Sequence, residues 1–389
     1  MITLNSTEKV ISEKISELKN SSGSHSPSIF TIIKKIPELE INIDACFLSN
    51  PYATDLFLEN LTSELIQTGK LRDYMEFYPS QNDIIAKSIA KSINLDSKNI
   101  FVGNGAIEVI QAVMHNYVKN SIVVNIPTFS SYYEFVIPGT KVHYYQLNKN
   151  GNYLLDTEEY LNFVKNINPS AVVIINPNNP NGGYLNIDDL DYILQELDFI
   201  DNIIIDESFI HFAYENKTLD LKSATNIYNK YSNLIIIKSM SKDFGIAGIR
   251  AGYGVMSQQK VKNLLLNGYL WNCSGLTEYF FKLYSNKTFF DNYNQIRKIY
   301  ISETKLFFDK LSSIPQIKVY PTMANFALIE LLDGSLSSDF VSKMLIKFGI
   351  YTRICDDKIG LQGEFVRIAS RTKKENQIII NSIKNIFND

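Results

Sequence analysis

Residues 238–250 read KSMSKDFGIAGIR, and this stretch decides the fold of the chain. It lies between two apolar runs, Leu234 to Ile237 and Ala251 to Val255, which are both typical of buried strands. Lys242 therefore stands near a strand end, beside two hydroxyl side chains and among glycines that let other groups approach the backbone closely. A lysine amine whose pKa is lowered by burial or by a cationic neighbour attacks carbonyl compounds. The whole stretch therefore favours a reactive lysine over a glycine-rich turn with a solvated lysine.

The composition is that of an ordinary globular protein. With 389 residues, 45% hydrophobic and 20% charged, the chain can form two domains and a large core. A net charge of −3 gives no electrostatic reason to expect nucleic acid or a membrane as partner, and no apolar run is long enough to span a bilayer. The polar N-terminus does not resemble a secretory signal, and the four histidines show no metal-ligand spacing. Scattered cysteines predict a reduced, cytoplasmic protein: Cys46, Cys273 and Cys355.

Short apolar runs alternate with segments of helical spacing. The runs occupy residues 99–102, 121–125, 171–176, 202–206, 234–238 and 251–255. Between the first two, apolar residues are spaced as on one face of a helix: Ile107, Ile110, Met114, Tyr117 and Val118. This alternation predicts an α/β fold with a mostly parallel sheet that is covered on both faces.

The pattern changes near Gly275 to longer helices with few strands. We therefore expect a large domain over residues 50–270. A smaller α+β domain is expected to combine residues 1–49 and 271–389, with the N-terminal segment contributing to the substrate site.

Three further motifs follow predicted strands, and parallel sheets gather their chemistry at the carboxyl ends of strands. Asp206 ends the run 202–205, where a buried carboxylate needs a cationic partner. The turn 176–183, NPNNPNGG, follows the run 171–175, and 103–108, GNGAIE, leads into a helix N-terminus that can bind an anion. Together with Lys242, and in this order, these motifs resemble the fold-type I aminotransferases, which use pyridoxal phosphate.

The resemblance implies how the cofactor is held. Lys242 would bind it covalently, and Asp206 would pair with the protonated pyridine nitrogen, which keeps the ring an electron sink. Asn179, the asparagine before Pro180, would donate to the ring hydroxyl oxygen. The implied ligands of the cofactor phosphate are Gly105, Ala106, Ile107, Ser239, Ser241 and Arg250.

Two aromatic residues complete this implied cofactor site. Phe129, in the sequence Pro127-Thr128-Phe129, matches the ring that stacks on the cofactor, with core packing as a close alternative. Tyr78, before Pro79, matches the tyrosine that reaches the cofactor phosphate of the neighbouring subunit, with ordinary packing as the alternative. The resemblance therefore implies a homodimer as the active unit.

At two positions the sequence differs from the pattern of histidinol-phosphate aminotransferases, and both differences bear on the type of reaction. The sequence Asp206-Glu207-Ser208-Phe209 replaces the Asp-Glu-Ala-Tyr of histidinol-phosphate aminotransferases, so Phe209 cannot donate to the ring oxygen. Arg371 stands where those aminotransferases usually carry glycine. Both departures, and Trp271, resemble the L-threonine-O-3-phosphate decarboxylase branch. The branch implies decarboxylation. A histidinol-phosphate-type aminotransferase is the alternative, and a binding module without chemistry is a third.

Substrates of this branch carry a phosphate, which requires a second anion site. Arg367, in FVRIA, matches the arginine that binds the substrate α-carboxylate, whose geometry suits a planar fork; a surface arginine on an edge strand is the alternative. The segment 22–28, SGSHSPS, stands in place of a His-Gly-Gly segment, with a flexible loop as the alternative. The expected substrate ligands are Arg367, Arg353, His25, Ser26, Asn50 and Arg371.

The altered His-Gly-Gly segment favours a phosphorylated amino acid smaller than threonine phosphate. Within the branch the chain is similar to decarboxylases of L-serine phosphate, with threonine phosphate as the alternative substrate. The implied products are ethanolamine phosphate and carbon dioxide. Ethanolamine phosphate would suit the decoration of a capsular or other surface polysaccharide.

Overall fold

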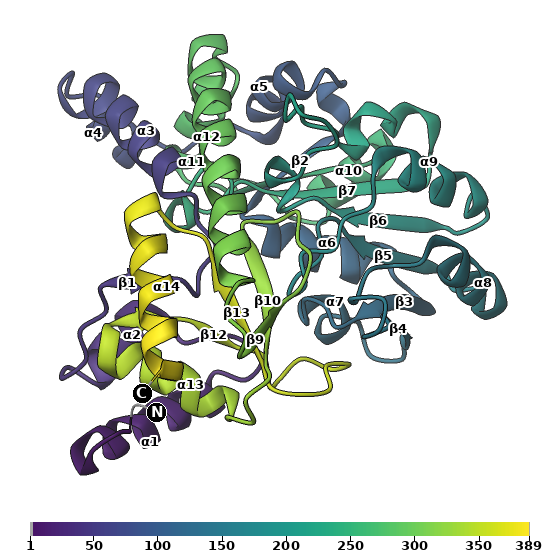
Figure 1. The fold of residues 1–389 in the computed structure, drawn as a ribbon. Helices are drawn as coiled ribbons and strands as arrows, with labels where there is room; N and C mark the ends of the chain where they lie inside the picture. Colours follow the sequence, from purple (N-terminus) through teal and green to yellow (C-terminus); the bar gives the residue numbers. More distant parts are fainter. Residues whose placement is uncertain (1–2, 389) are drawn as a thin grey trace.

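The computed structural model describes residues 3–388 and centres on a seven-stranded sheet (Figure 1). The strand order is β2-β8-β7-β6-β5-β3-β4. Only β8 runs antiparallel to its neighbours in this sheet, so the predicted α/β fold with a mostly parallel sheet is confirmed. The strands are β2 Ile100–Asn104, β3 Ser121–Ile126, β4 Lys141–Gln146, β5 Ala171–Ile175, β6 Asn202–Asp206, β7 Leu234–Ser239 and β8 Ala251–Val255.

All six predicted runs are strands of this sheet, and β4 is the strand that was missed. It lies at the edge of the sheet, pairs only with β3 and is largely exposed. Its sequence, KVHYYQ, therefore contains no continuous apolar run. An edge strand that faces solvent does not need one.

Helices cover both faces of the large sheet because alternate residues of its central strands point to opposite sides. Ile203 and Ile205 of β6 pack into one hydrophobic cluster, while Ile204 between them packs into the other. The second cluster includes Val109 and Val113 of α6. The helices around this sheet are α5 Asn82–Ile93, α6 Ala106–Tyr117, α7 Ser131–Glu134, α8 Thr157–Ile167, α9 Ile187–Glu196, α10 Gln258–Leu266 and α11 Gly275–Tyr284.

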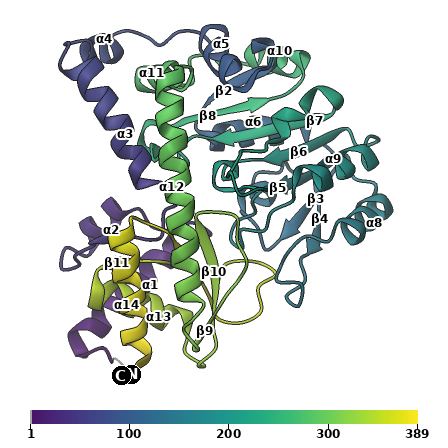
Figure 2. The same cartoon turned by 45° about the horizontal axis from the view of Figure 1, so that its top comes forward.

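A second, antiparallel sheet has the strand order β12-β13-β10-β9. Its strands are β9 Ile317–Val319, β10 Phe326–Leu331, β12 Arg353–Ile354 and β13 Phe365–Ala369. The helices α13 Ser337–Phe348 and α14 Lys373–Asn388 lie beside it (Figures 1 and 2). The N-terminal segment joins this unit through the parallel pair of β1 Ile43–Asp44 with β11 Ile350–Tyr351.

The long helix α12, Lys287–Leu311, connects the two units (Figure 2). Tyr293 near its start packs with Phe280 of α11 in a cluster of the large sheet. Phe307 and Leu311 at its end pack in the cluster of the small sheet. The hydrophobic clusters therefore place α11 with the large sheet. The domain division at residue 270 stays a prediction.

The remaining helices lie in the N-terminal part of the chain or are short 3-10 turns. They are α1 Ser6–Ser21, α2 Ile29–Lys35, α3 Pro51–Leu61, the π-helix η1 Thr62–Ile66, α4 Leu71–Glu76, η2 Ser97–Asn99, η3 Ile210–Phe212, η4 Ala224–Asn226, η5 Tyr228–Lys230 and η6 Ala247–Ile249. Within residues 3–388, no helix combines the length and the apolar character needed to cross a membrane.

Candidate active site

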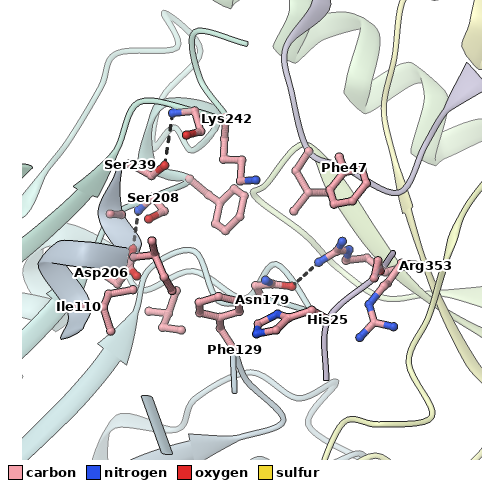
Figure 3. Close-up of a pocket in the computed structure, with 18 of the residues that line it drawn as sticks. His25, Phe47, Ile110, Phe129, Asn179, Asp206, Ser208, Ser239, Lys242 and Arg353 are labelled. Carbon is pink, nitrogen blue, oxygen red and sulfur yellow. Dashed lines mark hydrogen bonds between the residues drawn. The ribbon is translucent and has the colours of Figure 1, made fainter. Parts of the chain in front are cut away.

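A cavity of about 270 Å³ lies at the carboxyl ends of β5, β6 and β7, where the large sheet faces the small one. Ile175, Asp206 and Ser239, the last residues of these three strands, line it. Figure 3 shows Lys242 and Asp206 on one side of the cavity and His25 and Arg353 on the other. This is the edge of a parallel sheet at which binding sites form.

Lys242 lines the cavity just after β7, and its pKa is lowered to about 8. Removal from water is the largest cause, and the guanidinium groups of Arg367 and Arg250 add to it. The main-chain carbonyl of Lys242 accepts a hydrogen bond of 2.9 Å from the amide of Asn50, which fixes the turn. A substantial fraction of this amine is therefore neutral and nucleophilic near pH 8.

Asp206 is buried and accepts two hydrogen bonds from the protein. The hydroxyl of Tyr132 donates to Oδ2 at 2.7 Å, and the amide of Ser208 donates to Oδ1 at 2.8 Å. Burial raises the pKa of Asp206, and these two hydrogen bonds oppose that rise. No lysine or arginine in the described part of the chain forms a salt bridge with it. A buried carboxylate of this kind fits a cationic ring nitrogen.

The N-terminus of α6 forms a cradle for an anion. Gly105 precedes α6 with φ of 77°, and a Cβ at this position would clash with the guanidinium of Arg250. Ala106, Ser239, Ser241 and Arg250 all line the cavity here. Helix amides, hydroxyls and a guanidinium together make a phosphate site. The cradle, with Lys242 and Asp206 beside it, fits pyridoxal phosphate.

The predicted ring contacts also line the cavity. Phe129 and Asn179 both face it, and Asn179 Oδ1 accepts a 2.7 Å hydrogen bond from Arg367 Nη1. Phe209 lies in the cavity wall with its ring edge-on to Phe326, 5.0 Å between centroids. It brings no hydroxyl to the site. Among the predicted ring contacts, Asn179 is therefore the residue with an amide that can donate to a ring oxygen.

Arg367 and Arg353 lie directly opposite each other on β13 and β12 and are both buried. Arg367 Nη2 donates to the carbonyl of Cys46 at 2.8 Å, while its Nε has no partner among residues 3–388. Arg353 Nη2 donates to Asp357 and to the carbonyl of Ser24, while its Nη1 has no partner in the described part of the chain. The alternative of a surface arginine is wrong for Arg367. Two buried guanidiniums with spare donors therefore lie side by side in the cavity wall.

The N-terminal segment reaches the cavity, as predicted. Ser24, His25 and Ser26 line it, with the His25 ring 6.1 Å from the ring of Phe129. Ser26 Oγ accepts a hydrogen bond from the Cys46 thiol at 3.3 Å. Residues 24–26 thus form part of the wall around Arg353.

Four residues with a predicted binding role do not line the cavity of their own chain: Gly105, which shapes the anion cradle, and Asn50, Arg371 and Tyr78. Asn50 caps α3 by accepting from the amides of Tyr52 and Ala53, and Arg371 Nη1 donates to the carbonyl of Ser49 at 3.1 Å. Both side chains help to hold the 49–53 turn, but within residues 3–388 Asn50 Nδ2 and Arg371 Nε are buried without a hydrogen-bond partner, so a role in substrate binding stays a prediction for both. Tyr78 is 87% exposed and packs against Trp271 at the surface.

Sequence reasoning missed Tyr132 and Lys358. Tyr132 lies in α7, three residues after Phe129, which precedes that helix, and no local pattern marks Tyr132 as a partner of Asp206. Lys358 lines the cavity from the loop between β12 and β13. No local pattern marks it, because the loop is brought there by the pairing of β12 with β13.

The chain is similar to known proteins over its full length. It is 64% identical over 389 residues to an L-serine phosphate decarboxylase of Campylobacter jejuni, covering 100% of both chains. The structure of a decarboxylase from Sulfurospirillum multivorans matches with a TM-score of 0.94 and 45% identity, covering 98% of this chain and 97% of the other. A histidinol-phosphate aminotransferase from Clostridium acetobutylicum matches with a TM-score of 0.77 and 29% identity, covering 89% and 99%.

The family model described as "Aminotransferase class I and II" matches residues 47–383. These residues include the lysine, the aspartate, the anion cradle and both cavity arginines. The fold is accordingly that of the fold-type I enzymes that use pyridoxal phosphate, as the motifs implied. The chain therefore belongs to the aminotransferase class I and II family.

Proposed function

We propose that this chain is a decarboxylase that uses pyridoxal phosphate to convert L-serine phosphate to ethanolamine phosphate and carbon dioxide. One observation carries this proposal: two buried arginines lie opposite each other on β13 and β12 in the cavity wall, and within residues 3–388 Arg367 Nε and Arg353 Nη1 have no partner. Figure 3 shows Arg353 across the cavity from Lys242. L-serine phosphate has two anionic groups, a carboxylate and a phosphate, for these two sites. The similarity to an L-serine phosphate decarboxylase supports this substrate.

Each residue has a distinct task in this reaction. Pyridoxal phosphate, when bound, accepts the electrons that the departing carboxylate leaves behind. Asp206 holds the proton on the ring nitrogen, and Ser239, Ser241 and Arg250 with the α6 amides hold the cofactor phosphate. Arg367 holds the substrate carboxylate and so sets the direction of the bond to Cα. Lys242 returns a proton from Nζ to Cα.

The phosphate of the substrate would bind in the part of the cavity wall formed by Arg353 and the N-terminal segment. Arg353 donates to it through the unpartnered Nη1, and Ser24, His25 and Ser26 enclose it. Threonine phosphate is the alternative substrate. In serine phosphate and in threonine phosphate alike, the same number of bonds separates the carboxylate from the phosphate.

We also propose a homodimer, in a cytoplasmic protein whose three cysteines, Cys46, Cys273 and Cys355, stay reduced. Large apolar side chains are exposed on α4, on the segment after it and on the segment after α10, and two of them, Tyr78 and Trp271, pack against each other. They are Met75 at 70%, Phe77 at 65%, Tyr78 at 87%, Leu270 at 55% and Trp271 at 58% exposed. We call these side chains the Tyr78 patch. A second copy of the chain would bury it and bring Tyr78 to the neighbouring cofactor phosphate.

The proposal is tested by incubating the cofactor-loaded protein with L-serine phosphate and no keto acid, followed by mass spectrometry. Catalytic release of ethanolamine phosphate and carbon dioxide is the expected result, and Lys242→Ala should abolish it. Formation of one equivalent of a keto product, with the cofactor converted to its amine form, would instead identify an aminotransferase. Comparison with threonine phosphate decides between the two substrates.

A further inference from the structure

A buried lysine in the cavity wall has no role in the reaction described above. Lys358 lies in the loop between β12 and β13 with 5% of its side chain exposed. Its amide donates to the carbonyl of Cys355 at 3.1 Å, and its carbonyl accepts from the amide of Leu361 at 3.2 Å. This turn holds the side chain inward, where it lines the same cavity as Arg353.

The same loop is anchored to the large sheet. Gln146 at the end of β4 donates to the carbonyl of Gly360 at 3.0 Å, and Lys149 donates to the carbonyl of Gln362 at 2.8 Å. The position of Lys358 relative to the cofactor side of the cavity is therefore fixed by both units. A fixed cation is suited to recognition.

The charges around Lys358 do not balance. Its Nζ lies 3.4 Å from Asp357 Oδ2, but that carboxylate also binds Arg353 Nη2 at 2.7 and 2.8 Å and lies 3.6 Å from Lys19 Nζ. Three cations thus share one carboxylate, and Arg367 adds a further positive charge nearby.

The buried ammonium group of Lys358 is only partly stabilised by its neighbours. Removal from water lowers the pKa of its ammonium, and Arg353 lowers it further against the opposing effect of Asp357. A buried cation in this state gains from any anion that enters the cavity. The excess positive charge suits a group that carries two negative charges.

We propose that Lys358 is the specificity-determining residue that selects a doubly charged phosphate ester over a singly charged group of the same shape. The inference rests on the proposed function, which brings such an ester to Arg353. A phosphate monoester carries close to two negative charges above its second pKa near 6, whereas a sulfate ester carries one. Arg353 can hydrogen-bond either ester, and its charge is already met by Asp357 at 2.7 and 2.8 Å, so the added preference for a second negative charge comes from Lys358.

The test compares ethanolamine phosphate with its sulfate isostere, 2-aminoethyl sulfate, as ligands of the cofactor-loaded protein at pH 8. Titration calorimetry gives the dissociation constants for the wild type, Lys358→Met and Lys343→Met. Lys343 is the matched control, because it is also buried and paired with one carboxylate, Asp339 at 2.7 Å, but lies on α13 outside the cavity.

The wild type is expected to prefer the phosphate by about tenfold or more. Lys358→Met should weaken phosphate binding about tenfold and sulfate binding only a few-fold, so that the preference is mostly lost. Lys343→Met should keep the full preference for the phosphate over the sulfate. Lys358→Arg retains the positive charge and should keep most of that preference. Lys358→Gln replaces Lys358→Met if the latter fails to fold, as judged by its melting temperature.

An unchanged preference in folded Lys358→Met or Lys358→Gln would overturn the inference while leaving the proposed function intact. A wild type that binds its cofactor but neither turns over L-serine phosphate nor binds ethanolamine phosphate would overturn the proposed function itself. The two failures are therefore distinguishable in one set of measurements.

Discussion

The reactivity of Lys242 is set by the charges that surround it. Desolvation and the guanidiniums of Arg367 and Arg250 lower its pKa to about 8, while Asp44 and Cys46 act in the opposite direction. Arg367 therefore has two effects in this site. It offers a ligand for a carboxylate, and it keeps a fraction of the Lys242 amine neutral before the cofactor binds.

The rate at which pyridoxal phosphate attaches to the apoprotein should report this coupling. The neutral amine is the reactive form, so the rate should rise with pH and reach half its maximum near pH 8, the pKa of Lys242. Arg367→Gln removes a neighbouring positive charge. The loss of that charge stabilises the Lys242 ammonium and raises the pKa of Lys242, so the midpoint of the rate profile should move to higher pH. Stopped-flow absorption measures both profiles, with the exposed Lys165→Gln as control. Superimposable profiles for wild type and Arg367→Gln would contradict the coupling.

Tyr132 is a positioning residue that acts through Asp206. Tyr132→Phe removes the 2.7 Å hydrogen bond to Asp206 and should raise the pKa of that carboxylate further. Losing one such bond costs about 1 kcal/mol, which corresponds to roughly fivefold in turnover or in cofactor affinity. The matched control is Tyr160→Phe, because the Tyr160 hydroxyl is buried and has no hydrogen-bond partner within the described residues, 3–388. Equal effects of the two changes on turnover would remove Tyr132 from the site.

At the scale of elements, the α6 N-terminus and the turn after β7 form one unit. Arg250, with φ of 62°, directs its guanidinium over Gly105, and a Cβ at Gly252 of β8 would clash with the amide of Ala106. The glycines therefore permit the close approach of β8 to the start of α6. This contact brings helix amides and side-chain phosphate ligands together.

Gly105→Ala should weaken the binding of pyridoxal phosphate by about tenfold or more. The added methyl group meets the Arg250 guanidinium and also strains a backbone with φ of 77°. Gly139→Ala is the control, since Gly139 has φ of 92° but open space around its Cβ position. Fluorescence titration of the apoproteins gives both affinities. If Gly139→Ala weakens binding as much as Gly105→Ala does, the loss reflects general strain and the cradle is not its cause.

The elements that sequence predicted are those with a local signature. Strands whose residues are almost all buried form continuous apolar runs, which is why six of the seven strands of the large sheet were found, including β2 at one edge. The motif residues sit in turns directly after those strands, so locating the strands also located Lys242 and Asp206. The exposed edge strand β4 and Lys358 carry no such signature, because pairing partners far away in the sequence fix their positions.

Asn50 and Arg371 show a different limit. Their positions near the site were implied by resemblance, but the direction of each side chain depends on which backbone groups remain to be satisfied. Asn50 caps α3, and Arg371 binds the carbonyl of Ser49. These contacts satisfy a helix N-terminus and a main-chain carbonyl. Each side chain keeps one buried donor without a partner in residues 3–388, Asn50 Nδ2 and Arg371 Nε, so their predicted role as substrate ligands stays a prediction.

At the scale of the whole molecule, the cavity is built by both units. Asp206 and Lys242 come from the large sheet, Arg353 and Arg367 come from the small sheet, and α12 packs in the clusters of both. The Tyr78 patch lies on the surface outside this cavity. An exposed apolar surface of this kind is costly in a monomer, which is the physical reason to expect that a second copy covers it.

The wild-type protein should therefore be a dimer in sedimentation velocity experiments. Trp271→Lys places a charge in the Tyr78 patch and should shift the protein toward monomer, with weaker binding of pyridoxal phosphate because Tyr78 no longer reaches the neighbouring site. Tyr78→Phe should leave the dimer intact and loosen only the cofactor, since it removes a hydroxyl and keeps the ring. Phe199→Lys is the control, because Phe199 is an exposed aromatic residue, 47% accessible, outside the patch. A wild-type monomer with full activity would show that neither Tyr78 nor a second copy is part of the site.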